Sequence, residues 1–250
     1  MSAALRRLRS EDRGTSLTEM LIVMLILGIV IAAAASLSIM LTRANGQNVA
    51  RQDQIDAARV AVERMSKTTR TAVKPSQLIT SCNATCDQVE AFMQGGDLSM
   101  KFYGNLDNAK NAVGPSQITY TIASSGAKAG VLVEKVQIPD SPNPTSNGYQ
   151  YCNAEATGAS AECKSRLRTR DVVSGVQTSS AVFTFYGPGG TRLNPGAGGV
   201  LSAADLNKVL SVEITLTVQS DSPTRPDPTT YIQRITLPNA QAVIPQGEDD

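Results

Sequence analysis

The chain has 250 residues, a length that suits one domain of ordinary size plus an anchor. Its 23 basic and 22 acidic side chains nearly cancel, which argues against a strongly basic nucleic-acid binder and against an acidic tail protein. Histidine is absent, so Ser-His-Asp and Cys-His nucleophile systems and imidazole zinc sites are excluded. Because aromatic residues make up only 4% of the chain, any core must consist mainly of Val, Ile, Leu and Ala.

The N-terminal region combines a basic flank with an apolar run. Residues 1–14 carry four arginines against two acids, and residues 20–41 carry no charge. At about 1.5 Å per residue, a helix over residues 20–41 can cross a hydrocarbon core of about 30 Å. Positive charge holds the N-terminal flank in the cytoplasm. We therefore expect a single crossing of the cytoplasmic membrane, with residues 42–250 outside the cytoplasm.

Glu19 stands at the front edge of this apolar run, and two interpretations leave it without a role. In the first, the run is an uncleaved anchor and Glu19 lies at the membrane interface. In the second, it is a secretory signal peptide that is cleaved at the A-x-A-like site before Ser36. The run is slightly long for a signal peptide, and an acid stands where basic residues are usual.

A third interpretation gives the carboxylate a role. The stretch GTSLTEML (14–21) resembles the processing site of type IV pilins and type II secretion pseudopilins. The resemblance implies that a prepilin peptidase cuts after Gly14 and that Thr15 becomes the N-methylated N-terminus. It also implies that Glu19 pairs with the α-amino group of a neighbouring subunit during filament assembly. An acid at a helix centre in lipid costs about 2.5–3.5 kcal/mol, less near the edge, and pairing would remove most of that penalty.

Three positions extend the comparison with this family. Thr15 stands where the family commonly has Phe, and Gly28 matches a glycine that is usual in the middle of the segment. Ser36 stands where major pilins often have a helix-bending proline. The missing proline suits a less bent helix and favours a minor component of the filament.

The helix is expected to continue past the membrane segment, since residues 48–72 contain neither Pro nor Gly. Their apolar residues lie on roughly one stripe, so the helix is amphipathic and needs a sheet to pack on. Pro75 is expected to end it. The members of the stripe are Val49, Ile55, Ala58, Val62 and Met65.

The remainder of the chain predicts β structure, from segments rich in Val, Ile, Thr and Tyr with period-2 alternation. The clearest segment places Val212, Ile214, Leu216 and Val218 on one face, which we expect to pack on the helix. The predicted strands are 76–80, 98–103, 117–123, 130–138, 181–186, 209–219 and 231–237.

These elements together predict an α+β, pilin-like fold in which a long N-terminal helix, half transmembrane and half amphipathic, packs on an antiparallel β-sheet head. The predicted divisions are a leader peptide (1–14), a transmembrane assembly segment (15–41), the amphipathic continuation (42–74), a β-rich head outside the cytoplasm (75–246) and an acidic tail (247–250).

The later segments resemble one subgroup of the family. VFTFYGPGGTRL (182–193), LSVEITLTV (210–218) and YIQRITLPN (231–239) are similar to the PilW/PulJ group of minor pilins and J-type pseudopilins. This resemblance implies a minor pilin at or near the filament tip that helps to prime polymerisation. Its implied partners are prepilin peptidase, other minor pilins, the major pilin and the inner-membrane assembly platform. Two alternatives stay open: a J-like pseudopilin of a type II secretion system, and a competence pilin that binds DNA or a surface.

The four cysteines come as two local pairs, Cys82 with Cys86 and Cys152 with Cys163. Outside the cytoplasm disulfides are the default, and of the three possible connectivities we expect nearest-neighbour pairing. A four-cysteine zinc site would need a reducing compartment and the usual CxxC spacing, which is missing. We expect no metal and no cofactor.

The remaining candidate sites are weak. A strand in this region would expose a basic row made of Arg166, Arg168 and Arg170. Such a row indicates either DNA contact through phosphates or a charged edge that blocks strand pairing, and we favour the charged edge. A loop with Asp221 and Asp227 lacks the dense oxygen ligands of a calcium site. No motif suggests an enzyme.

The predicted processing can be tested by the intact mass and N-terminal sequence of the protein recovered from membranes, with and without a prepilin peptidase. We expect a chain that begins at Thr15 only when the peptidase is present. A chain that begins near Ser36 would instead identify an ordinary signal peptide.

Overall fold

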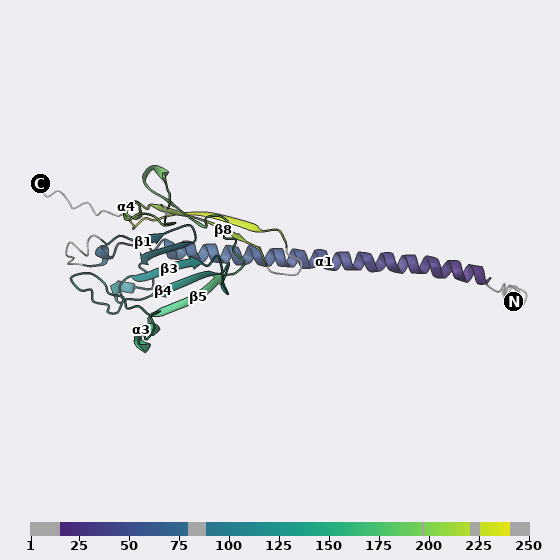
Figure 1. Cartoon of the computed structure of the whole chain (residues 1–250), viewed down its shortest axis with the longest axis horizontal. Coiled ribbons are helices and arrows are strands. Elements are labelled where there is room, and N and C mark those ends of the chain that lie inside the picture. Colours follow the sequence, from purple (N-terminus) through teal and green to yellow (C-terminus); the bar gives the residue numbers. More distant parts are fainter. Residues whose placement is uncertain (1–15, 80–88, 197, 221–225, 241–250) are drawn as a thin grey trace, which may run out of the picture. The chain divides into compact units, whose positions relative to one another are not determined.

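A computed structural model describes residues 16–79, 89–196, 198–220 and 226–240. The chain divides into two compact units, which we call the anchor unit (Met1–Val49) and the head unit (Ala50–Asp250). Helix α1 (Leu17–Thr69) contributes residues to both units (Figure 1). The long N-terminal helix predicted from the sequence is confirmed.

In the anchor unit, α1 is formed by a nearly uninterrupted run of apolar residues. Two of its hydroxyl side chains bond to the helix itself: Ser36 Oγ donates to the Ala32 carbonyl at 2.8 Å, and Thr42 Oγ1 donates to the Ser38 carbonyl at 2.9 Å. Such bonds satisfy a hydroxyl without a partner from outside the helix. The position that carries a proline in many major pilins is therefore an ordinary helical residue here.

The C-terminal end of α1 differs from the prediction. The helix ends at Thr69, before Pro75, because the following residues bond to strand β2 (Ser99–Gly104) instead: Val73 N–H donates to the Tyr103 carbonyl at 2.9 Å. The predicted strand 76–80 is wrong over its described part. Pro75–Leu78 forms a short 3₁₀ helix, η2, whose first residue is a proline with its φ already fixed.

Two antiparallel sheets make up most of the rest of the head unit. The first has the strand order β1-β2-β3-β4-β5, and the second has the order β7-β6-β8-β9. The first comprises β1 (Phe92–Gly95), β2 (Ser99–Gly104), β3 (Ser116–Ile122), β4 (Leu132–Gln137) and β5 (Leu167–Val173). The second comprises β6 (Phe183–Tyr186), β7 (Arg192–Leu193), β8 (Ser211–Val218) and β9 (Thr229–Thr236).

Six of the seven predicted strands are confirmed, as β2, β3, β4, β6, β8 and β9, with small shifts at their ends. β1 and β7 were not predicted, and β5 was considered only as a possible basic edge. Short helical turns connect the strands: η3 (Ala109–Asn111), α3 (Ala161–Ser165), η4 (Pro188–Gly190) and α4 (Ala203–Leu206).

The core of the head unit lies where α1 meets the inner faces of both sheets, and Figure 1 shows this part of α1 between β8 and the strands of the first sheet. Ala58, Val62 and Met65 of the predicted stripe are buried, whereas Val49 is 61% exposed. The buried face begins only at Ala50. The four apolar residues predicted on one face of β8 are all buried, and Gln54 Nε2 of α1 donates to the Val218 carbonyl at 3.0 Å.

The contrast between the two faces of the second sheet predicts the effect of matched substitutions. Ile214 of β8 is fully buried and Ile232 of β9 is 66% exposed. Ile214→Ala should lower the free energy of unfolding by about 2–5 kcal/mol, because it leaves a cavity in the core. Ile232→Ala should change it by less than about 0.5 kcal/mol. Denaturant unfolding followed by near-UV circular dichroism would measure both, and equal effects would contradict the packing described.

Candidate functional site

Glu19 lies in the first turn of α1 and is exposed. Ser16 precedes the helix, and its carbonyl and hydroxyl oxygens accept from the Glu19 N–H at 2.9 and 3.4 Å. Ser16-x-x-Glu19 therefore has the sequence and part of the geometry of a capping box, in which a serine and a glutamate satisfy free N–H groups at a helix start. A carboxylate here is also favoured by the positive end of the helix dipole. This local role was missed, although the S-x-x-E spacing could have indicated it.

The apolar side chains that follow Glu19 have no cover within the anchor unit. Every large apolar side chain from Leu17 to Leu41 exposes more than half of its surface. α1 is long and apolar enough to cross a membrane by its length and composition. Since contiguous exposed apolar surface of this extent is unfavourable in water, this segment requires lipid or the helices of other subunits around it.

Several predicted site residues fall outside the described residues. They are Gly14 and Thr15 of the cleavage site, Cys82 and Cys86, and Asp221 of the loop considered for calcium.

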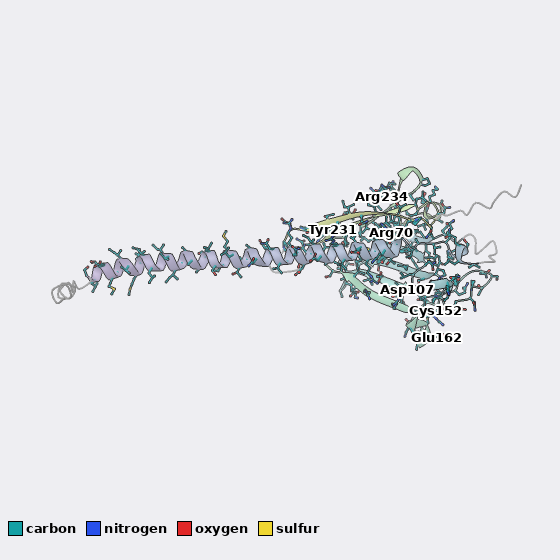
Figure 2. All side chains as sticks on the ribbon, turned by 180° about the vertical axis from the view of Figure 1, so that it is seen from behind. Arg70, Asp107, Cys152, Glu162, Tyr231 and Arg234 are labelled. Atoms are coloured by element: carbon teal, nitrogen blue, oxygen red, sulfur yellow. A yellow bond between two sulfur atoms is a disulfide. The ribbon has the colours of Figure 1, made fainter. Side chains whose placement is uncertain are left out.

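The other predicted cysteine pair is a disulfide: Cys152 and Cys163 are bonded, with their Cα atoms 6.0 Å apart. Cys163 lies in α3, whose first turn is capped by Ser160 Oγ, which accepts from the Cys163 N–H at 3.1 Å. Figure 2 labels Cys152 and Glu162 in this part of the head. Both cysteines lie in the long connection between β4 and β5, so the bond closes a loop within that connection. Over the described ranges, no group of three or more His, Cys, Asp or Glu residues could hold a metal ion.

The arginines of the predicted basic row are not equivalent in the structure. Arg166 follows α3 and pairs with Glu162 at 2.6 Å and Asp140 at 3.4 Å. Only Arg168 and Arg170 lie on β5, and both are exposed. Short-range capping of α3 thus interrupts the strand-like alternation that the sequence suggested.

β5 is the edge strand of the first sheet, and Arg168 and Arg170 line a groove of about 890 Å³ between this edge and α1. Acidic side chains share the groove: Arg168 lies 3.9 Å from Asp107, and Glu63 of α1 contributes to the lining. A surface of mixed charge attracts phosphates less than a basic one. The geometry therefore favours the charged-edge interpretation over DNA contact.

An ion pair joins α1 to the first sheet beneath this groove. Arg64 Nη2 lies 2.5 Å from Glu134 Oε2, and Tyr120 Oη donates to Glu134 Oε1 at 2.6 Å. The Glu134 side chain is 3% exposed and that of Arg64 is 38% exposed. Burial, and the hydrogen bond to Glu134, raise the pKa of the Tyr120 phenol, and the same carboxylate raises the pKa of Arg64.

The pair was missed in the sequence because Arg64 fits the polar side of an amphipathic helix. The available signal was in β4, where the alternation Leu132, Glu134, Val136 puts a carboxylate on a face that is otherwise apolar. Such a residue needs a cation or several donors when the face is buried.

Comparison with known families identifies one match: residues 9–35 match the prokaryotic N-terminal methylation motif. No curated protein and no solved structure matches the chain. The matched residues cover the end of the basic flank, the predicted cleavage site, Glu19 and the first part of the apolar helix.

This motif, followed by a long helix that packs on antiparallel sheets, supports the class of type IV pilins and pseudopilins. For that class it implies processing by prepilin peptidase and assembly with other pilins.

The buried ion pair predicts that removal of Arg64 alone destabilises the head more than removal of both charges. Arg64→Met should lower the free energy of unfolding by about 2–3 kcal/mol, at the low end for buried pairs because Arg64 is partly exposed. The double variant with Glu134→Gln should recover part of this loss, since no charge is then left buried. Arg59→Met, the same change at an exposed arginine of the same helix, is the control. Denaturant unfolding measures all three, and a double variant less stable than Arg64→Met would contradict the argument.

Proposed function

We propose that this chain is a minor type IV pilin, a structural subunit that is processed by prepilin peptidase and enters the filament at or near its tip to prime or support assembly. The observation that carries the proposal is the anchor unit: a methylation motif leads directly into a helix whose apolar side chains are all exposed, with one carboxylate in its first turn. Such a segment suits packing among the helices of other subunits inside a lipid membrane or a filament.

The minor role has its own support. Ser36 is an ordinary helical residue that bonds to the Ala32 carbonyl, where many major pilins have a proline. The segments that resemble the PilW/PulJ group contain β6, β7, β8 and most of β9, the strands of the second sheet. Within this proposal the protein is held in the cytoplasmic membrane, exposes its head outside the cytoplasm, and meets the assembly platform and the major pilin there.

A J-like pseudopilin of a type II secretion system is the second candidate, because it would use the same helix and the same carboxylate. The neighbouring genes separate the two: a secretin with exoprotein genes indicates secretion, and retraction ATPase and major pilin genes indicate a pilus. DNA binding has less support, since Arg166 is engaged by two acids and Arg168 lies near a third.

The role of Glu19 can be separated from its role as a helix cap. Gln is as suitable as Glu at the third position of a capping box, but it cannot pair with an α-amino group as an ion. In cells that lack the wild-type chain, Glu19→Gln should therefore leave cleavage and helix content unchanged. It should reduce the number of surface filaments at least about tenfold, which corresponds to a loss of roughly 1.4 kcal/mol in the free energy of subunit docking.

Glu63→Gln is the matched control, because Glu63 is another exposed glutamate of α1. It should restore filaments as well as the wild-type chain does. Filaments sheared from these cells should contain the chain at a low ratio to the major pilin, measured by quantitative mass spectrometry. Normal filament numbers with Glu19→Gln would reject the docking role, and a ratio near one would reject the minor role.

A further inference from the structure

The outer face of the first sheet, opposite to the face that packs on α1, carries a polar pocket of about 480 Å³. Its floor is made by residues of β2, β3 and β4 whose side chains alternate with the buried ones, and its wall is the segment 149–155. This volume falls within the range of about 300–1,000 Å³ that is typical of small-molecule sites. The floor includes Lys101, Gln117, Lys135 and Gln137.

The wall of the pocket is held in place by several bonds. Tyr151 Oη donates to the Pro115 carbonyl at 2.5 Å, and Asp140 N–H donates to the Gln150 carbonyl at 2.9 Å. Gln137 Nε2 donates to the carbonyl of Cys152, and the disulfide to Cys163 fixes the same residue. A wall that is bonded in this way needs little ordering when a ligand enters, which favours binding.

The charges in the pocket do not balance. Lys101 and Lys135 lie in one row across the sheet, with Thr119 between them, so their Cα atoms are about 10 Å apart. Lys135 Nζ lies 2.6 Å from Glu155 Oε1, and Lys101 is attracted by the same carboxylate. Partial burial lowers the pKa of Lys101. Two ammonium groups thus share one carboxylate.

The carboxylate of Glu155 is weakly held. Its side chain is 60% exposed, and an ion pair as exposed as this contributes no more than about 1 kcal/mol. A ligand carboxylate could therefore replace it at a small energetic cost. Gln117 Nε2 donates to Tyr103 Oη at 3.4 Å and Gln137 Nε2 donates to the Cys152 carbonyl. Each amide keeps a second N–H and a carbonyl oxygen, which suit hydroxyl groups, whereas sulfate can only accept.

We propose that this pocket binds a small sugar that carries a carboxylate, such as a hexuronate. The carboxylate of the sugar lies at Lys101, between the two lysines, and its hydroxyl groups bond to the glutamine side chains of the floor. The site is independent of the anchor unit and adds to the proposed function a ligand at the surface of the head.

Isothermal titration of the full chain in detergent micelles tests this proposal with three probes: glucuronate, glucose and sulfate. Glucuronate should bind more tightly than either of the others. Lys101→Gln should weaken the binding of glucuronate by about 10–100-fold, because a hydrogen bond to a charged group contributes about 1.5–3 kcal/mol. Lys135→Gln should weaken it as well. Glu155→Gln should strengthen it, because the competing carboxylate is lost.

Lys128→Gln is the matched control, because Lys128 is a surface lysine paired with Asp171 and does not line the pocket. It should bind glucuronate as the wild-type chain does, and thermal unfolding should show that all variants are folded. The proposal is overturned if glucuronate produces no binding heat, if sulfate binds as tightly, or if Lys128→Gln weakens binding as much as Lys101→Gln does.

Discussion

The constraint on which the rest of the structure depends is that one helix must be stable in two different surroundings. Over residues 17–41, α1 exposes apolar side chains on all sides, and over residues 50–69 it buries one face against two sheets. A helix satisfies its backbone hydrogen bonds internally, so the same element can serve in lipid and against protein. The sequence changes accordingly, from a segment whose only charged residue is Glu19 to an amphipathic one. Because α1 begins within the matched motif and ends within the head unit, the motif and the sheets are interpreted together as one pilin-like chain.

In the head unit, polar contacts fix the position of α1 in addition to its apolar face. Small and flexible apolar residues such as Ala58 and Met65 could pack at neighbouring positions on the sheets. The pair of Arg64 with Glu134 cannot shift, because a displaced helix would leave a buried carboxylate without its cation. The bond from Gln54 to the Val218 carbonyl does the same on the second sheet. α1 is thus held in one position by a polar contact with each of the two sheets.

Local pattern was enough to predict the elements whose signal is long or regular. The helix followed from an uninterrupted run, and β8 followed from the alternation of Val212, Ile214, Leu216 and Val218. The elements that were missed depend on contacts far away in the sequence. β7 has only two residues, and α1 ends at Thr69 because the next residues bond to β2, which no local breaker announces. The Arg64–Glu134 pair joins residues 70 positions apart, so the sequence does not show which cation meets the carboxylate on the apolar face of β4.

Under the proposed function, Glu19 would combine a local role at the helix start with a role in assembly. If processing occurs after Gly14, the new α-amino group stands only one residue before the serine that caps α1. The first turn would then hold a positive terminus, the positive end of the helix dipole and a single carboxylate. Ser16 already accepts the Glu19 N–H, so the helix start does not depend on the carboxylate alone. Within the proposed function, the carboxylate would meet the terminus of a neighbour while Ser16 still accepts the Glu19 N–H, so docking would cost the helix little stability.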